Sequence, residues 1–217
     1  MTNKYKVIFL DWSGTLSKSK FWGHLQSSND RDLSLFNKME EALFSQSKEL
    51  LNPWMRGEYR SEDICEVVAE KTGVAYKLVF DEFVKGCKLM EICSLEVPKL
   101  LQSIKETGAM IVIATDNMDS FKRWTWPMLQ EKYTNLFDGV LSSSELKVMK
   151  EDTTNDANLF FDKYLKDNGL SYRECLLIDD SPDKKGIFSQ IGLDYIQVLT
   201  TEKFIASLKK LTNKTGV

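Results

Sequence analysis

A carboxylate directly follows a short apolar run near the start of the chain. Val7-Ile8-Phe9-Leu10 leads into Asp11-Trp12-Ser13-Gly14-Thr15. A carboxylate that ends a buried strand and precedes a glycine-containing turn lies where a substrate can reach it, and it can act as a nucleophile. Ser13 is the unusual residue of this segment, because a second carboxylate is the residue type that such chemistry usually needs there.

Two later apolar runs also end in polar residues that could act together with Asp11. Thr115-Asp116-Asn117 follows one run, Asp179-Asp180-Ser181-Pro182-Asp183 follows another, and Lys150 lies in the loop between them. In a doubly wound α/β sheet the ligand binds beyond the carboxyl ends of the strands. We therefore expect a nucleophile, a hydroxyl donor, a cluster of carboxylates and a lysine to meet at one edge of a sheet.

These residue types suit phosphoryl transfer. Asp11 can attack phosphorus and form an acyl phosphate, but its charge repels an anionic phosphate, so a cation must bridge the two. Mg²⁺ prefers oxygen ligands, and Asp11 could hold it together with Asp180 and Asp179. Thr115 and Lys150, with backbone N–H groups of the turn after the nucleophile, would then bind the non-bridging phosphate oxygens.

The composition is that of an ordinary globular protein and excludes several classes of partner. The chain has 217 residues and a net charge of −3, so it offers no basic field to nucleic acid or to an anionic membrane. Its longest apolar run, residues 109–114, is too short to span a membrane, and no apolar leader segment is recognisable. We expect a cytoplasmic protein without a nucleic-acid or membrane partner.

Histidine and cysteine usage narrows the chemistry further. The single histidine, His24, excludes a multi-histidine metal site, so carboxylates, a lysine and a metal ion must carry any reaction. The four cysteines include no Cys-x-x-Cys pair, which indicates free thiols in a reducing compartment.

The spacing of the apolar runs predicts a parallel sheet. Each run is continuous rather than alternating, and helical stretches such as Pro98 to Thr107 separate the runs, as in buried parallel strands. This alternation predicts a doubly wound α/β fold. The expected strands are Val7 to Leu10, Met110 to Ala114, Cys175 to Ile178 and Tyr195 to Val198, with residues 139–141 as a weaker fifth.

Residues 17–93, called the helical insert below, break this alternation. They contain no convincing strand, and their apolar residues recur at helical spacing, as in the face formed by Leu33, Phe36, Met39 and Leu43. We expect residues 1–16 and 94–217 to form the α/β core and the helical insert to form a small all-helical domain above the catalytic edge. Trp12 faces that domain and is a candidate for shaping the substrate pocket.

Four segments together resemble the motifs of the haloacid dehalogenase (HAD) superfamily. They are Asp11-Trp12-Ser13-Gly14-Thr15, Ile113-Ala114-Thr115-Asp116-Asn117, Lys150 and Leu177-Ile178-Asp179-Asp180. The resemblance spans nearly the whole chain and is to the phosphatase-like members that carry a helical cap between the first two motifs. It implies a Rossmann-like core, a helical cap and Mg²⁺ as cofactor.

The resemblance also assigns roles at the site. Asp11 would be the nucleophile, and the carbonyl oxygen of Ser13 and the carboxylate of Asp180 would be metal ligands, with Asp179 beside them. The implied phosphate-binding set is Thr115, Asp116, Asn117 and Lys150. We favour Lys150 over Lys147, because the family places its lysine just before a Pro-Asp-like pair, which here reads Glu151-Asp152.

Ser13 departs from the family pattern. Family phosphatases carry an aspartate there that protonates the leaving oxygen and later activates water. Serine is a poor acid and a poor base near neutral pH, and general acid–base help is typically worth about 10² to 10⁴ in rate. We expect intact binding of Mg²⁺ and phosphate, with slow turnover or turnover confined to acyl, enol or aryl phosphates.

The function that the sequence predicts is therefore a Mg²⁺-dependent, HAD-type phosphatase. It would act on a small phosphorylated metabolite through an aspartyl-phosphate intermediate at Asp11. One alternative is a non-catalytic or regulatory protein that binds a phosphorylated metabolite. Another is a 2-haloacid dehalogenase-like hydrolase in which Asp11 attacks carbon, which the Asp179-Asp180 pair disfavours because that chemistry needs no metal.

Overall fold

Five parallel strands form the central sheet of the computed structural model, which describes residues 4–27, 29–154 and 157–212. The strands are β1 (Val7–Leu10), β2 (Met110–Thr115), β3 (Gly139–Ser142), β6 (Cys175–Asp179) and β7 (Asp194–Gln197). Their order across the sheet is β3-β2-β1-β6-β7, with all neighbours parallel. The predicted doubly wound sheet is confirmed, although β7 begins and ends one residue before the predicted strand.

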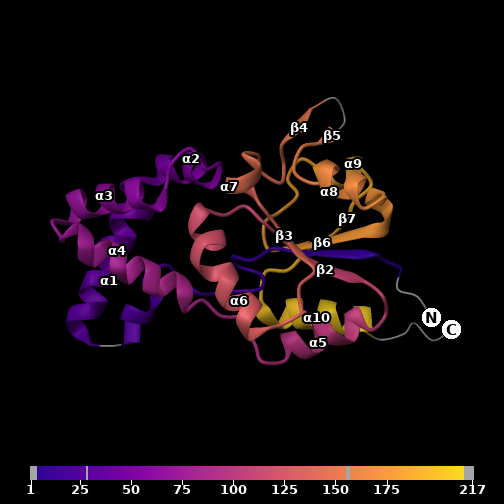
Figure 1. The fold of residues 1–217 in the computed structure, drawn as a ribbon, viewed down its shortest axis with the longest axis horizontal. Coiled ribbons are helices and arrows are strands. Elements are labelled where there is room, and N and C mark those ends of the chain that lie inside the picture. Colours follow the sequence, from indigo (N-terminus) through magenta and orange to yellow (C-terminus); the bar gives the residue numbers. More distant parts are fainter. Residues whose placement is uncertain (1–3, 28, 155–156, 213–217) are drawn as a thin grey trace.

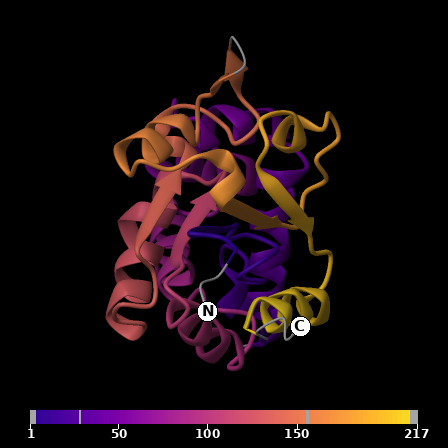
Figure 2. The same cartoon turned by 90° about the vertical axis from the view of Figure 1, so that its right-hand side faces the viewer.

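Helices cover both faces of the sheet, because successive side chains of a strand point to opposite faces. Ile8 and Leu10 pack toward α5 (Val97–Lys105), α6 (Trp126–Lys132) and α10 (Thr201–Thr212). Val7 and Phe9 pack on the other face toward α8 (Asp162–Asp167) and α9 (Ile187–Gln190). Figure 2 shows the helices on either side of the sheet. Burial on both faces explains why the strands read as continuous apolar runs.

The helical insert leaves the sheet after β1 and returns before β2, and its helices gather beside the sheet (Figure 1). In the described part of this segment the structure has helices and no strand, as predicted. The helices surround their own cluster of buried side chains, which includes Met39, Trp54 and Phe83. The helices are α1 (Asp30–Phe44), α2 (Leu51–Met55), α3 (Ser61–Thr72) and α4 (Tyr76–Lys88), with short 3-10 turns at Gly23–Ser27 and Lys48–Leu50.

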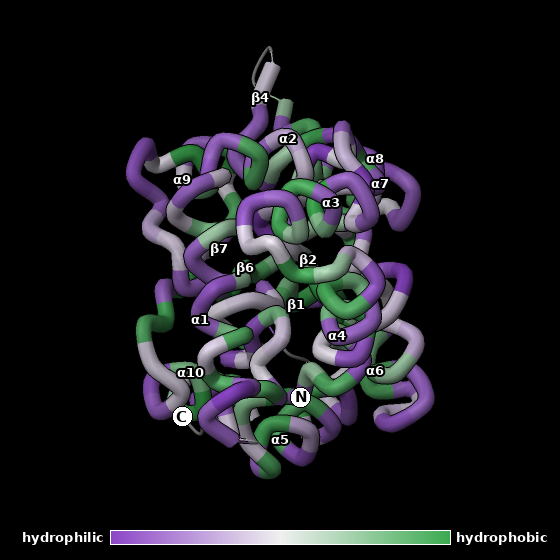
Figure 3. The backbone as a smooth tube through the Cα atoms, turned by 90° about the vertical axis from the view of Figure 1, so that its left-hand side faces the viewer, coloured by the Kyte–Doolittle hydropathy of each residue, from purple (hydrophilic) through white to green (hydrophobic). Residues whose placement is uncertain are grey.

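Hydropathy follows this arrangement. Figure 3 shows the hydrophobic stretches of β1 and β2 in the interior, whereas the helices around them carry alternating hydrophobic and hydrophilic segments. Leu33 is a departure from the predicted face of α1: it is 40% exposed, whereas Phe36 and Met39 are buried. Among the described residues, no helix is both long enough and apolar enough to cross a membrane.

Polar contacts attach α2 and the start of α3 to the core. Asp119 accepts hydrogen bonds from the indole of Trp54 at 2.8 Å and from the hydroxyl of Ser61 at 2.7 Å. Arg56 forms a two-pronged ion pair with Asp152, in which Nη2 donates to Oδ1 at 2.9 Å. These contacts hold one end of the helical insert next to the carboxyl ends of the strands.

Several short elements were not expected from the sequence. A hairpin of β4 (Thr153–Thr154) and β5 (Ala157–Asn158) projects from the core (Figure 1). Neither strand carries an apolar run, so the pattern that revealed the sheet could not reveal this hairpin. The remaining elements are a π-helical turn (Phe121–Thr125), α7 (Ser143–Leu146) and a 3-10 turn (Tyr172–Glu174).

Candidate active site

Three carboxylates meet at the carboxyl ends of the two central strands. Leu10 of β1 pairs with Ile178 of β6, so Asp11 and Asp179 leave the sheet side by side, with Asp180 next to them. One carboxylate oxygen from each of the three aspartates lies within 4.8 Å of the others. Asp11 and Asp179 are buried, and Asp180 is half-buried.

Lys150 reaches into this carboxylate cluster from the loop after α7. Its Nζ lies 2.8 Å from Oδ1 of Asp11 and also donates to Oδ2 of Asp179. The backbone of Lys150 is fixed as well, because its N–H donates to Oδ1 of Asp116 at 2.9 Å and its carbonyl accepts from Asn158 at 2.7 Å. The hairpin that carries Asn158 therefore helps to position the lysine.

Lys147, the other lysine considered for this role, lies elsewhere. Its Nζ donates to the carbonyl of Gly57 in the helical insert at 2.8 Å, and its side chain is exposed. The structure thus brings Lys150, and not Lys147, to Asp11. The lysine that precedes Glu151-Asp152 is therefore the one beside Asp11, and its role as a phosphate-binding residue stays a prediction.

The site carries an excess of buried negative charge. Burial raises the pKa of Asp11 above its ordinary value, and the charges of Asp179 and Asp180 raise it further, against the opposing effect of Lys150. The pKa of Asp180 is also raised, by burial and then by Asp179. Burial alone would lower the pKa of Lys150, but the surrounding carboxylates outweigh it and raise that pKa. One lysine does not balance three carboxylates, so the cluster favours an additional cation.

Two backbone hydrogen bonds hold the turn after Asp11. The N–H of Gly14 donates to the carbonyl of Ser17 at 2.8 Å, and the N–H of Ser17 donates to the carbonyl of Trp12 at 2.8 Å, which closes the turn on itself. Among the described residues, none donates a hydrogen bond to the carbonyl of Ser13. That carbonyl is therefore available to a cation.

Gly14 is required at its position. It has φ +83°, and a Cβ placed there would lie 2.1 Å from Oδ2 of Asp180. The carboxylate of Asp180 thus packs directly against the backbone of the turn at Gly14. The Asp11, Asp179 and Asp180 carboxylates form a set of oxygen ligands that suits Mg²⁺.

The hydroxyl of Ser13 is held by Asn117. The amide oxygen of Asn117 accepts the N–H of Met118 at 2.9 Å, so its Nδ2 is the atom that donates to Oγ of Ser13, at 3.3 Å. The backbone N–H of Asn117 in turn donates to Oγ of Ser143 at 2.9 Å. Because Ser13 accepts from Asn117, its own hydroxyl hydrogen remains available for another acceptor.

Thr115 ends β2 beside the cluster. Its side chain is fully buried, and its Oγ1 has no hydrogen-bond partner among the described residues. A buried hydroxyl without a partner is costly in a folded protein. An anion bound at the edge of the sheet would satisfy it.

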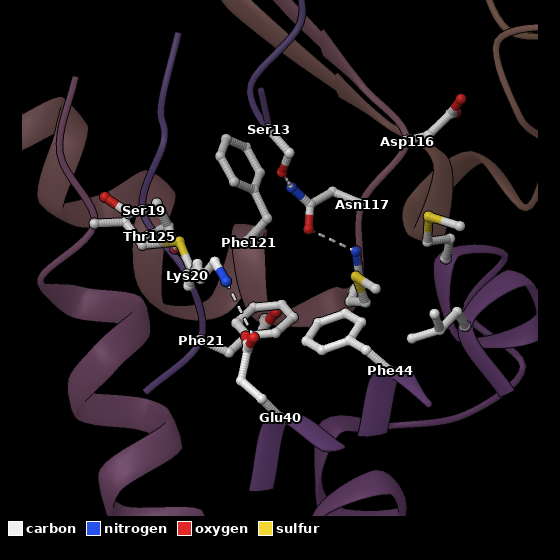
Figure 4. A pocket seen from close by; sticks show the side chains of 15 residues that line it. Ser13, Ser19, Lys20, Phe21, Glu40, Phe44, Asp116, Asn117, Phe121 and Thr125 are labelled. Carbon is white, nitrogen blue, oxygen red and sulfur yellow. Dashed lines mark hydrogen bonds and ion pairs between the residues drawn. The ribbon is translucent and has the colours of Figure 1, made fainter. Parts of the chain in front are cut away.

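Asp116 lies differently from the other residues of this segment. Its carboxylate accepts the N–H of Lys150 and points away from the cavity described next (Figure 4). Burial raises the pKa of Asp116, and Lys150 opposes the rise. In this structure Asp116 supports the loop that carries Lys150.

A cavity of about 430 Å³ opens beside Ser13, between the sheet and the helical insert. It begins at Ser13 and Asn117, and Phe21 and Phe44 lie across from them (Figure 4). Lys20 and Glu40 form an ion pair of 3.1 Å in its wall. The apolar residues of its wall include Phe21, Phe44, Leu51, Met55, Met118 and Phe121.

The sequence missed most of this cavity. Trp12, the expected pocket residue, is instead 1% exposed and packs in the core against Phe121, so that expectation was wrong. Ser143, which positions Asn117, also donates to the carbonyl of Met55 at 2.7 Å. Its place at the end of β3 is the one sequence signal that could have identified it.

Comparison with known proteins identifies the fold. Neither a family model nor a curated protein matches the sequence. A predicted HAD-like family hydrolase from Porphyromonas gingivalis is similar in structure, with TM-score 0.64 and 16% identity over 98% of this chain and 100% of that one. The chain therefore has the fold of the HAD-like hydrolases, as the motifs predict.

Two further structures show the range of chemistry found on this fold. A HAD family enzyme from Bacteroides thetaiotaomicron, in complex with magnesium and inorganic phosphate, has TM-score 0.59 and 15% identity over 89% of this chain and 93% of its own. L-2-haloacid dehalogenase from Xanthobacter autotrophicus, with chloropropionic acid covalently bound, has TM-score 0.60 and 13% identity over 95% of this chain and 83% of its own.

Proposed function

We propose that the protein is a Mg²⁺-dependent phosphatase of HAD type that hydrolyses a small phosphorylated metabolite. The observation that carries this proposal is the buried arrangement of Asp11, Lys150 and the Asp179-Asp180 pair at adjacent strand ends. Nucleophile, cation and carboxylate cluster stand where a phosphate could meet all three. The helical insert serves as the cap over this site.

The oxygen ligands of the site fit Mg²⁺. Asp11, Asp180 and the Ser13 carbonyl would hold the ion, with Asp179 beside them. When bound, Mg²⁺ supplies charge that offsets the repulsion between Asp11 and the substrate phosphate and polarises the phosphoryl oxygens. The magnesium and phosphate complex of the Bacteroides thetaiotaomicron enzyme, which shares the fold, supports this choice of ion.

Asp11 performs the first step. Lys150 holds its Oδ1, so Oδ2 is the oxygen that attacks phosphorus in line with the leaving group. A bond forms between Oδ2 and phosphorus, and the bond between phosphorus and the leaving oxygen breaks, with its electron pair staying on that oxygen. Lys150 and Thr115 stabilise the charge on the non-bridging oxygens.

Water completes the reaction. It attacks the phosphorus of the aspartyl phosphate, phosphate departs, and the Asp11 carboxylate is regenerated while one proton goes to solvent. Ser13 donates a hydrogen bond to the leaving oxygen but cannot supply its proton, since a serine hydroxyl is a poor acid near neutral pH. The leaving group therefore takes its proton from solvent.

The alternatives find less support in the site. A dehalogenase would use Asp11 against carbon and needs no cation, yet Asp179 and Asp180 crowd the nucleophile with negative charge. A purely binding protein would not need a buried carboxylate such as Asp11 beside Lys150 at its phosphate site. The buried free thiols Cys65, Cys87 and Cys175 support a reducing compartment, which we propose to be the cytoplasm.

The decisive experiment measures Mg²⁺-dependent phosphate release from acetyl phosphate and p-nitrophenyl phosphate. Wild type should release phosphate from both, and Asp11→Asn should abolish release. Asp81→Asn, which changes an exposed carboxylate of α4, is the matched control and should behave as wild type. Mg²⁺ and phosphate binding without release from either substrate would refute the phosphatase and leave the binding protein.

A further inference from the structure

The cavity beside Ser13 offers a ligand mainly apolar surface, and several of its polar wall residues already have partners. The hydroxyl of Thr125 donates to the carbonyl of Cys87 at 2.9 Å, and Oγ of Ser19 accepts the N–H of Glu91 at 3.1 Å. Lys20 and Glu40 neutralise each other. The rest of the cavity wall consists mainly of aromatic rings, methionines and a leucine.

Aromatic rings give the cavity flat walls. Phe21 and Phe44 are nearly parallel, with an interplanar angle of 9° and centroids 6.3 Å apart, and they lie across the cavity from Ser13 (Figure 4). Phe121 forms a third aromatic surface on the Ser13 side of the cavity (Figure 4). Rings favour offset-stacked or edge-to-face contact with other rings. A volume of about 430 Å³ falls within the range of roughly 300–1,000 Å³ typical of small-molecule sites.

Ser13 imposes a second requirement on the same ligand. The cavity begins at Ser13, so the part of the substrate that fills it is the leaving group. A hydroxyl at this position gives a hydrogen bond and no proton, so the leaving oxygen must depart as a stable anion. The pKa of a phenol is near 10, as for the tyrosine side chain, whereas the pKa of water is about 15.7.

From these two observations we infer that the substrate is an aryl phosphate monoester whose ring occupies the cavity between Ser13 and the Phe21–Phe44 pair. This inference rests on the proposed function and deepens it by naming the substrate class. Asp11 takes the phosphoryl group, the phosphorus–oxygen bond breaks, and an aryloxide leaves with the electron pair and is protonated by solvent. Water then releases phosphate from Asp11.

Sugar phosphates fit this cavity poorly. Several hydroxyls of a sugar would exchange water for the faces of Phe21, Phe44 or Met118, and a buried hydroxyl without a partner weakens binding about tenfold or more. Alkyl phosphates would fill the cavity, but their leaving oxygen is too basic to depart without an acid. An aryl group satisfies both the walls and Ser13.

The test compares four substrates at saturating Mg²⁺: p-nitrophenyl phosphate, phenyl phosphate, hexose 6-phosphate and acetyl phosphate. Acetyl phosphate has a good leaving group too small to use the cavity, so it reports the chemistry alone. We expect kcat/KM for both aryl phosphates to exceed that for the hexose phosphate by about 100-fold or more. Equal rates with the hexose phosphate would overturn the inference.

Two matched variants test the cavity itself. Leu51→Asp places a carboxylate in its wall at the first residue of α2, where a helix tolerates negative charge. It should raise KM for p-nitrophenyl phosphate about tenfold and leave acetyl phosphate within twofold. Leu33→Asp makes the same change at an exposed position outside the cavity and should alter neither. Unchanged aryl kinetics in Leu51→Asp would contradict the inference.

A binding measurement separates this inference from the proposed function. Phenylphosphonate and methylphosphonate carry carbon–phosphorus bonds that hydrolysis does not cleave, and their effect on the Tm can be compared with Mg²⁺ present. Phenylphosphonate should raise the Tm more than methylphosphonate does, and Leu51→Asp should remove this difference between the two phosphonates. If acetyl phosphate is not hydrolysed but this difference holds, the phosphatase fails and the aryl site stands. If acetyl phosphate is hydrolysed and both phosphonates act alike, the aryl site fails alone.

Discussion

The Nζ of Lys150 lies 2.8 Å from Oδ1 of Asp11, and both side chains are only 6% exposed. A lysine so placed does two things at once. It offsets the repulsion among three neighbouring carboxylates, and it occupies one of the two carboxylate oxygens of Asp11, which in the proposed function leaves the other to attack the substrate. The same contact therefore bears on stability and on chemistry, and the two can be measured separately.

Lys150→Met should destabilise the protein and abolish turnover. Removing one partner of a buried ion pair leaves uncompensated charge, which typically costs about 3–5 kcal/mol. Urea unfolding without Mg²⁺ measures this loss, and phosphate release measures the activity. Lys147→Met is the matched control, and its exposed position predicts a change within about 0.5 kcal/mol. A similar loss in both variants would show that the position of Lys150 is not special.

Mg²⁺ should stabilise the folded protein, because the carboxylate cluster has more negative charge than Lys150 balances. At a Mg²⁺ concentration of 100 times Kd, mass action contributes about 2.7 kcal/mol to the free energy of unfolding. The measurement is the Tm with Mg²⁺ and after removal of Mg²⁺ by EDTA. Asp180→Asn should reduce the difference, and an unchanged difference would place the ion elsewhere.

Ser13→Asp should raise turnover most for substrates with basic leaving groups. The aspartate would supply the acid and base that serine lacks, which is worth about 10² to 10⁴ in rate. Measured kcat for an alkyl phosphate should therefore rise much more than kcat for p-nitrophenyl phosphate. Ser13→Asn, of the same size and without an acid, is the control. No gain in Ser13→Asp would mean that another group already supplies the proton.

The Arg56–Asp152 pair predicts a pH dependence of stability. The guanidinium of Arg56 holds the pKa of Asp152 below its ordinary value. A lowered folded pKa means that the unfolded chain binds more protons, so the stabilisation is complete above the unfolded value of about 3.9 and is lost as the pH falls through the folded value.

Arg56→Met should accordingly lower the free energy of unfolding by about 1 kcal/mol at pH 7. Urea unfolding between pH 7 and pH 3 should show the difference from wild type shrinking below about pH 4. Lys77→Met, which breaks an exposed pair within α4, controls for the loss of a surface charge. A difference that stayed constant with pH would argue that Arg56 acts through packing instead.

The sheet and the strand ends could be predicted because both leave local signals. Strands buried on two faces are continuous apolar runs, and polar residues that directly follow them, such as Asp11 and Thr115, must lie at one edge. The cavity left no such signal. Phe21, Phe44 and Met118 come from segments far apart in sequence, and only the packing of the helical insert brings them together.

Individual side chains were hardest to predict where packing competes with exposure. Trp12 follows Asp11, yet the alternation along β1 turns it into the core, where it contacts Phe121. Phe121 in turn both packs in the core and lines the cavity. The orientation of Asn117 depends on the backbone of Met118 and on Ser143, which no pattern in the sequence connects to it.

The close contact between Asp180 and Gly14 limits how this site can be redesigned. Position 14 admits no side chain, since its first carbon would meet the carboxylate that the site depends on. Position 13 is exposed, and among the described residues its hydroxyl has one hydrogen-bond partner, the Asn117 amide at 3.3 Å. A mutant library that holds residue 14 constant and varies residue 13 would therefore test substrates with other leaving groups while keeping the turn after Asp11 intact.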